Sequence, residues 1–211
     1  MLGAPTAATQ ELWFVLHGYG QLAEYFIRHF RGLTDAAAPD RTVVVAPEAL
    51  NRFYLASAAD DHARSRVGAT WMTREKRESE ITDYVTYLNL LYAQLRPLAP
   101  GARVTVLGFS QGTATASRWL AALPEAPARL VLWAGAFPED MAFAAAPALL
   151  NGTTALHTVL GDADTVVTPA SQARQARFLA DHDLRATPHR FAGGHTLDAG
   201  VLRTLRAAVD D

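Results

Sequence analysis

The sequence predicts an α/β fold in which one doubly wound, mostly parallel sheet forms a single domain without a large lid. Short apolar segments alternate with helical patterns, and most of these segments show no alternation of polar and apolar residues. A strand of that kind is buried on both faces, as in a parallel sheet covered by helices. The chain of 211 residues suits one core. We therefore expect residues 1–211 to form one domain, with residues 1–10 poorly structured or in an edge strand.

Six segments rich in Val, Leu and aromatic residues are expected to be the strands. They are Leu12–Leu16, Thr42–Ala46, Arg103–Leu107, Leu130–Ala134, Thr154–Leu160 and Ala186–Phe191. Helical patterns lie between most of them, and a repeated strand–helix order implies right-handed crossovers within one sheet.

Five segments are expected to be helices: Leu22–Phe30, Arg74–Arg96, Gln111–Leu123, Pro169–His182 and Asp198–Val209. The longest, Arg74–Arg96, has apolar residues spaced three and four apart, which is typical of a helix packed on a sheet. Thr73 is its expected N-cap, and Pro97 stops it. Leu50–Met72 fits neither pattern, so we expect a long excursion over the ligand-binding edge of the sheet.

Composition narrows the class of protein. Half of the residues are hydrophobic and 19% are charged, as in an ordinary soluble globular protein. The formal net charge of -2 gives no reason to expect a nucleic acid or an anionic membrane as partner. The absence of cysteine excludes disulfides, a thiolate nucleophile and sulfur-ligated metals. No signal-peptide pattern and no apolar run near ~18 residues is visible, so we expect a cytoplasmic protein without integral membrane association.

A strand–turn–helix segment carries the strongest motif of the chain. Residues 108–112 read Gly-Phe-Ser-Gln-Gly, a G-x-S-x-G pattern, directly after the apolar strand and directly before a helix. In this context the serine lies on a sharp, strained turn that exposes its hydroxyl above the sheet. Glycines on both sides allow the strand and the helix to approach closely. Ser110 is therefore the predicted nucleophile.

A serine nucleophile needs a general base, which we expect on a loop after the last strand. Of the seven histidines, His195 alone lies in such a loop, between Gly194 and Thr196. His17, His29 and His62 precede the serine, and the other three fall in or at the end of predicted strands and helices. His195 is the predicted base.

The base in turn needs a carboxylate that orients it, expected after the penultimate strand. The loop there contains Asp162 and Asp164. Asp164 directly precedes the turn into the next helix and is favoured, whereas Asp162 is expected to cap or brace the loop.

The first predicted strand ends in Leu16-His17-Gly18-Tyr19-Gly20. We expect the backbone N–H groups of Tyr19 and Gln111 to form an oxyanion hole, with His17 bracing the loop. The same turn also fits G-x-G-x-x-A, the dinucleotide fingerprint, in which Glu48 would be the ribose-binding acid. That Rossmann oxidoreductase alternative leaves the loops of Ser110, Asp164 and His195 unexplained.

Together these motifs resemble the phospholipase/carboxylesterase family, the acyl-protein-thioesterase-like branch of the α/β-hydrolases. The resemblance covers about Leu12 to Val209 and rests on residues 16–20, 108–112, 161–169 and 194–195. It implies a triad of Ser110, Asp164 and His195, no cofactor, and hydrolysis of a small-molecule acyl ester, with thioesters and lysophospholipids as further candidates. Because members of that family often dimerise, it also allows a homodimer.

The chain departs from the family pattern at Gln21–Phe26 and at Gly68–Glu75. Within the second segment, Trp71 and Met72 are expected either to line an acyl pocket or to pack in the core. An alternative of another class is a hydrolase-fold binding protein that has lost activity. The complete set of Ser110, Asp164 and His195 favours an enzyme over that alternative.

Overall fold

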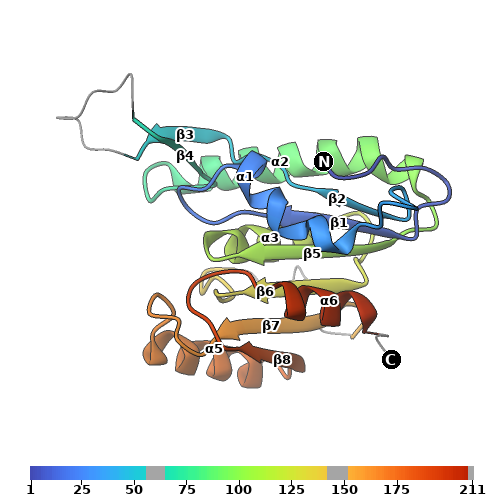
Figure 1. Ribbon diagram of the computed structural model, residues 1–211. Helices are drawn as coiled ribbons and strands as arrows, with labels where there is room; N and C mark the ends of the chain where they lie inside the picture. The colour runs from blue at the N-terminus through green and yellow to red at the C-terminus, as the bar shows by residue number, and fades with distance from the viewer. Residues whose placement is uncertain (56–64, 142–151, 209–211) are drawn as a thin grey trace.

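A six-stranded parallel sheet is the centre of the computed structural model, which describes residues 1–55, 65–141 and 152–208. The strand order is β2-β1-β5-β6-β7-β8 (Figure 1). The strands are β1 (Glu11–Leu16), β2 (Thr42–Val45), β5 (Arg103–Phe109), β6 (Arg129–Trp133), β7 (Ala155–Gly161) and β8 (Ala186–Phe191). All six predicted strands are confirmed, with ends that differ by two residues at most.

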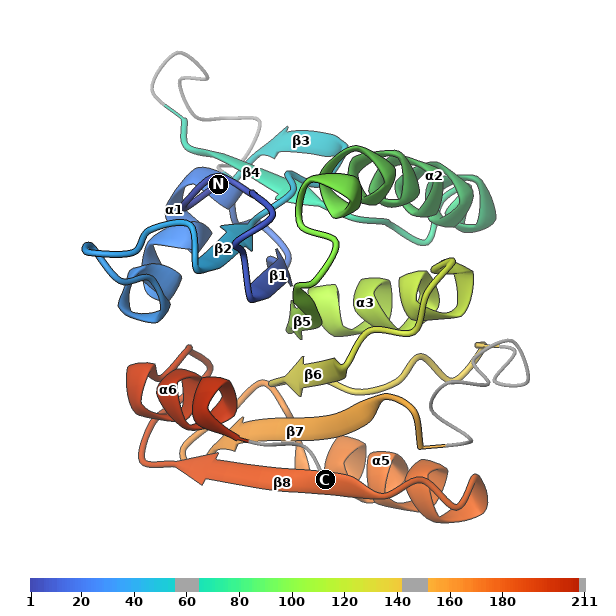
Figure 2. The same cartoon turned by 90° about the vertical axis from the view of Figure 1, so that its right-hand side faces the viewer.

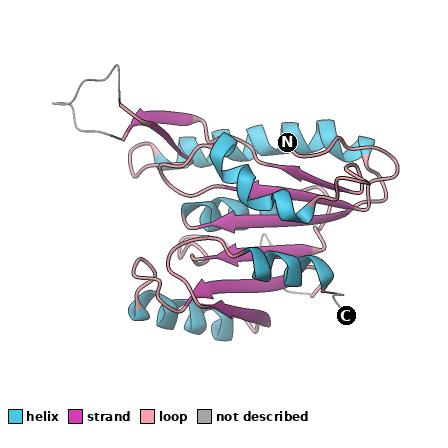
Figure 3. Cartoon of the chain, in the orientation of Figure 1, coloured by secondary structure: helices cyan, strands magenta, loops and turns pink. Residues whose placement is uncertain are grey.

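Helices cover both faces of the sheet, as Figures 2 and 3 show. One face packs against α1 (Ala23–Phe26), the 3₁₀ helix η1 (Ile27–Leu33) and α6 (Ala199–Ala207). The other packs against α2 (Arg77–Leu95), α3 (Gln111–Ala122) and α5 (Pro169–Asp181), and a short 3₁₀ turn, η3 (Arg96–Leu98), follows α2. The two faces give two apolar clusters, so the sheet is buried on both sides, as its apolar strands predict. No helix among the described residues is long and apolar enough to cross a membrane.

Two predicted helices differ in detail from the structure. The segment predicted as the helix Leu22–Phe30 forms one short α-helix and then a 3₁₀ helix. The long helix begins at Arg77, after Lys76 with φ 48°. Thr73 is therefore no N-cap, because its hydroxyl accepts a hydrogen bond from the Glu75 N–H (3.2 Å), outside the helix.

A small antiparallel hairpin, β3 (Asn51–Tyr54) and β4 (Val67–Thr70), was not predicted. It occupies the described part of the segment expected to be an excursion, and residues 56–64 of that segment, His62 included, lie outside the described residues. Figure 1 shows the hairpin at one end of the sheet. Gly20 N–H donates to Ala69 O (2.8 Å) and Ala69 N–H to Gln21 O (3.1 Å), so β4 is joined to the loop after β1.

The connections of the sheet place a topological switch point between β1 and β5. From β1 the chain passes to β2 on one side and later returns to β5 on the other, so the winding direction reverses there. Ligands bind at such a switch point, outside the carboxyl ends of the strands. The loops that follow β1 and β5 contain residues 17–22 and Ser110.

Candidate active site

Ser110 lies on a strained turn between β5 and α3. Its backbone has φ 53° and ψ -117°, a region that residues other than glycine rarely adopt. Three hydrogen bonds hold the turn: Ser110 N–H donates to Trp133 O (2.8 Å), and the N–H and hydroxyl of Thr113 donate to Ser110 O (3.0 and 2.7 Å). Tertiary contacts to the next strand and to α3 therefore hold the residue in an unfavourable conformation.

The two glycines around Ser110 are required by close backbone contacts. A Cβ atom on Gly108 would lie 2.2 Å from Gly112 O, and one on Gly112 would lie 2.3 Å from Leu16 O. Any side chain at either position would push the strand and the helix apart. The G-x-S-x-G pattern thus reflects packing between β5, α3 and β1.

The structure brings the side chains of Ser110, His195 and Asp164 into one hydrogen-bonded chain. His195 Nε2 lies 2.9 Å from Ser110 Oγ, and His195 Nδ1 lies 2.8 Å from Asp164 Oδ2. Because a carboxylate only accepts, the neutral imidazole carries its proton on Nδ1, and Nε2 is free to accept the hydroxyl proton of Ser110. This arrangement can remove a proton from the serine.

Asp164 is held ionised by its surroundings. Its side chain is 1% exposed, and its Oδ1 accepts the N–H groups of Val166 and Val167 (2.8 and 2.9 Å). Burial acts to raise the pKa of Asp164, but hydrogen bonds from Val167, His195 and Val166 outweigh it and lower the pKa. Asp162, by contrast, is 57% exposed and forms an ion pair with Arg190 (2.9 Å). Only Asp164 of the two contacts the histidine.

The amides of Tyr19 and Gln111 lie in the two loops that flank the serine. A Cβ atom on Gly18 would lie 3.2 Å from Ser110 Cβ, so the loop after β1 lies against Ser110. Between described residues, neither the Tyr19 nor the Gln111 N–H donates a hydrogen bond to a protein acceptor. Gln111 is also the first residue of α3, where the helix dipole favours negative charge. Both donors are thus available to an anionic oxygen.

The side chain of Gln111 ties the turn at Ser110 to β4, a role that the sequence analysis missed. Its Nε2 donates to Thr70 Oγ1 and Met72 O (both 2.9 Å), and its Oε1 accepts the Trp71 N–H (3.1 Å). The sequence predicts a role for the backbone N–H of Gln111 but none for its side chain. Its partners lie about forty residues earlier, at the end of the unpredicted hairpin and directly after it, so no local signal could reveal them.

His17 and Trp71 complete the connection to the loop after β1. The Trp71 indole N–H donates to His17 O (2.8 Å). His17 Nδ1–H donates to Gly18 O (2.8 Å), and its Nε2 accepts the Ala49 N–H (3.1 Å). Burial lowers the pKa of His17, which favours this neutral form. As expected, His17 braces the loop, and Gln21 Oε1 helps by accepting the Gly18 N–H (2.8 Å).

Trp71 packs in the core, which is one of the two roles that the sequence left open. It is 1% exposed, and its ring meets Tyr84 edge-on with centroids 6.2 Å apart. Met72 is half-buried and packs against the same cluster, with its sulfur 3.6 Å from Arg118 Nη1. Trp71 therefore supports the loop after β1 through its indole hydrogen bond and stabilises the core through its packing.

The dinucleotide alternative does not fit the structure. Glu48 Oε2 accepts the Ala23 N–H at the start of α1 (2.9 Å), and Glu48 Oε1 lies 4.0 Å from His17 Nε2. The Glu48 carboxylate thus caps the start of α1 and faces the loop after β1. Among residues 1–55, 65–141 and 152–208, no group of three or more His, Asp or Glu is placed to hold a metal ion.

A model of the family described as Serine hydrolase (FSH1) matches residues 9–198. No curated protein matches the chain. Among solved structures, the chain is similar to esterase PE8, with 25% identity over 98% of this chain and 94% of that chain and a TM-score of 0.66.

Two more distant structures share the fold. The chain is 18% identical to acyl-protein thioesterase 2 of Zea mays, covering 98% of this chain and 97% of that chain with a TM-score of 0.68. It is 19% identical to a carboxylesterase from Mesorhizobium loti, covering 95% and 90% with a TM-score of 0.67. The α/β-hydrolase fold that the motifs imply is therefore confirmed.

Proposed function

Since the chain belongs to the serine hydrolase (FSH1) family, we propose that it cleaves carboxylic esters with a triad of Ser110, His195 and Asp164. The observation that carries this proposal is the continuous chain of hydrogen bonds from Ser110 Oγ through His195 to Asp164 (2.9 and 2.8 Å). A base within hydrogen-bond reach of the hydroxyl, itself oriented by a third group, is the arrangement that activates a serine.

The first step forms an acyl-enzyme. His195 Nε2 takes the hydroxyl proton while Ser110 Oγ attacks the ester carbonyl carbon, and the carbonyl oxygen becomes an oxyanion. The N–H groups of Tyr19 and Gln111 stabilise that oxyanion. The protonated His195 then gives its proton to the leaving alcohol, the carbon–oxygen bond of the ester breaks, and the acyl group remains on Ser110.

The second step regenerates the enzyme. His195 Nε2 takes a proton from a water molecule, whose oxygen attacks the acyl carbon. The tetrahedral intermediate collapses, Ser110 recovers its proton from His195, and the carboxylic acid leaves. Asp164 stays ionised throughout and stabilises the imidazolium in both steps, because Val166 and Val167 solvate its other oxygen.

The substrate class is a small acyl ester or thioester. Esterase PE8 and the carboxylesterase of Mesorhizobium loti are named for ester cleavage, and the Zea mays protein is named as a thioesterase. Both bonds are cleaved by the same two steps, because each offers a carbonyl carbon and a leaving group that accepts a proton.

Hydrolysis of p-nitrophenyl acetate by matched serine variants tests the proposal. Ser110→Ala should reduce kcat by a factor on the order of 10⁶, because the nucleophile is lost. Ser79→Ala, at an exposed serine of α2, is the control and should keep wild-type kcat. If the Ser110→Ala variant retained most of the activity on p-nitrophenyl acetate, the proposed mechanism would be overturned.

A further inference from the structure

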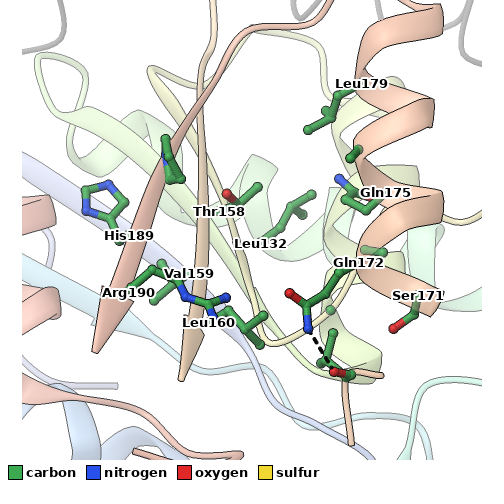
Figure 4. Close-up of a pocket in the computed structure, with 15 residues that line it drawn as sticks. Leu132, Thr158, Val159, Leu160, Ser171, Gln172, Gln175, Leu179, His189 and Arg190 are labelled. Atoms are coloured by element: carbon green, nitrogen blue, oxygen red, sulfur yellow. Dashed lines mark hydrogen bonds between the residues drawn. The ribbon is translucent and has the colours of Figure 1, made fainter. Parts of the chain in front are cut away.

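A cavity of about 210 Å³ lies between α5 and strands β6 to β8 (Figure 4). Its walls are mostly apolar. Leu132, Leu160, Leu179 and Pro188 form much of the lining, and Thr158 and Gln175 add polar groups. Helix α5 has no buried residue, so it rests on the sheet without filling the space beneath it.

Gln175 offers this cavity one unused hydrogen-bond donor. Its Oε1 accepts the Phe137 N–H (3.0 Å), which fixes the orientation of the amide, since a backbone N–H must meet an oxygen. The Nε2 atom is buried and finds no acceptor among the described residues. Figure 4 shows Gln175 reaching from α5 into the cavity. A buried donor without an acceptor is unfavourable, so a ligand oxygen here would gain a hydrogen bond.

The lining favours a neutral ligand. Two of its described residues are ionisable, His189 and Arg190. The Arg190 guanidinium is paired with Asp162 (2.9 Å). His189 Nε2 lies 3.1 Å from His157 Nδ1, and burial lowers the pKa of His189 and so favours its neutral form. A charged ligand would therefore lack a counter-ion in the cavity.

Two residues of the cavity lining contact the turn at Ser110 and the loop of Asp164. Gly135 lines the cavity, and a Cβ atom there would lie 2.8 Å from Ser110 O. Val167 also lines it, and its N–H donates to Asp164 Oδ1 (2.9 Å). Gly135 and Val167 are thus the residues through which the cavity wall borders the backbone of Ser110 and the loop that holds Asp164.

We propose that this cavity receives the acyl chain of the substrate and that Gln175 Nε2 donates to an oxygen on that chain. The substrates are then neutral esters of medium-length acids that carry an oxo or hydroxyl group away from the ester carbonyl. This inference rests on the proposed function. A cavity of about 150 Å³ can hold benzene, so this one has room for about eight heavy atoms.

Three p-nitrophenyl esters test the proposal: the acetate, the hexanoate and the 5-oxohexanoate. In the wild-type enzyme, kcat/KM for the oxohexanoate should exceed that for the hexanoate by about three- to tenfold, the effect of one hydrogen bond. Gln175→Met should bring this ratio to about one. Gln175→Glu should do so too, and it keeps an acceptor for the Phe137 N–H, so a loss in both variants identifies the missing donor.

Filling the cavity tests the site independently of the donor. Thr158→Phe should lower the ratio of kcat/KM for hexanoate to that for acetate by about tenfold or more. Thr187→Phe places the same side chain on β8 outside the cavity lining and should keep the wild-type ratio. If Thr158→Phe does not fold, Ala176→Leu fills the cavity from α5.

The outcomes separate the two proposals. Equal kcat/KM for hexanoate and oxohexanoate in the wild type, or ratios unchanged in the filling variants, would overturn the cavity assignment and leave ester hydrolysis intact. If none of the three esters is cleaved, the proposed function fails. The cavity is then tested with 2-heptanone, which should raise the Tm of Ser110→Ala but not that of Ser110→Ala/Thr158→Phe, and equal shifts would overturn it.

Discussion

The two halves of the sheet are packed very differently, and the site takes different parts from each. Around β1 and β5 nearly every strand residue is buried, and α3 buries eight of its residues against them. At β8 only partial burial is seen, and α5 buries none of its residues. The proposed nucleophile and both proposed oxyanion donors come from the tight half, whereas the proposed acid, the proposed base and the cavity come from the loose half.

This difference indicates which parts of the proposed site need precisely fixed positions. An oxyanion hole works when its donors are fixed before the reaction, so close packing around residues 18, 108 and 112 is required. The acid and base are held instead by a few hydrogen bonds on loops after β7 and β8. In the same half of the sheet, α5 covers the strands incompletely and leaves the cavity that we propose for the acyl chain.

The largest change in kcat is expected for one of the two aspartates in the loose half of the sheet. Asp164→Asn should lower kcat by a factor on the order of 10⁴, because the imidazole loses the partner that fixes its tautomer. Asp162→Asn should change kcat only a few-fold, since Asp162 is exposed and contacts Arg190. Steady-state hydrolysis of p-nitrophenyl acetate measures both. The reverse order would identify Asp162 as the orienting acid, and equal losses would contradict the assignment of that role to Asp164 alone.

A smaller effect is expected from loosening the tight half. Trp71→Phe removes the indole N–H that reaches His17 O and part of the buried ring, so kcat should fall about tenfold with KM little changed, because the proposed oxyanion donors are displaced rather than lost. Gln111→Met should act in the same direction.

Trp119→Phe is the matched control for this change. It removes a buried indole hydrogen bond of α3, to Asn89 Oδ1 (3.0 Å), away from the nucleophile. It should reduce stability without lowering kcat. A Trp71→Phe enzyme with wild-type kcat would show that the network through β4 does not position the oxyanion hole.

Leucine truncation compares the packing of the two halves directly. Leu12→Ala on β1 should reduce the free energy of unfolding by about 2–5 kcal/mol, because a fully buried side chain leaves a cavity. Leu179→Ala on α5 should cost about 1 kcal/mol, since this side chain is only partly buried and already borders an open space. Urea denaturation measures both values, and equal losses would mean that the halves are packed alike.

The smallest effect expected is the loss of stability in mild acid. Burial lowers the pKa of both His17 and His189 below the ordinary 6.5, so the unfolded chain binds more protons than the folded one as the pH falls below that value. Stability is therefore fully present above pH 6.5 and declines as the pH falls through the folded pKa values.

Urea denaturation at pH 7.5 and 5.5 checks this decline. His17→Gln should reduce the difference between the free energies of unfolding at the two pH values more than His189→Gln does. The reason is that His17 is fully buried and His189 only partly. A stability that does not change between the two pH values would mean that neither histidine is held neutral by the fold.

The strands and the turn at Ser110 could be predicted because their signals are local. Val104 to Leu107 is an apolar run, and the glycines at 108 and 112 mark the close approach of strand and helix. The loops of Asp164 and His195 follow from the order of strands in the fold. These features depend on residues close together in the sequence or on topology.

The hairpin and its contacts could not be predicted in the same way. Asn51–Tyr54 has no clean alternation, and its strand exists because it pairs with Val67–Thr70. The hydrogen bond from Trp71 to His17 joins residues far apart in sequence, and the partners of Gln111 lie at the end of this hairpin and directly after it. Likewise, the incomplete cover of β8 by α5 depends on where the helix docks, which its apolar spacing does not specify.

Covalent labelling of Ser110 by a fluorophosphonate tests the central claim most directly, because it requires the nucleophile and its base to act together. Mass spectrometry should locate one phosphonyl group on Ser110 of the wild-type chain, and His195→Gln should be labelled far more slowly under the same conditions. Labelling of the two proteins at the same rate, or a label on another residue, would contradict the account.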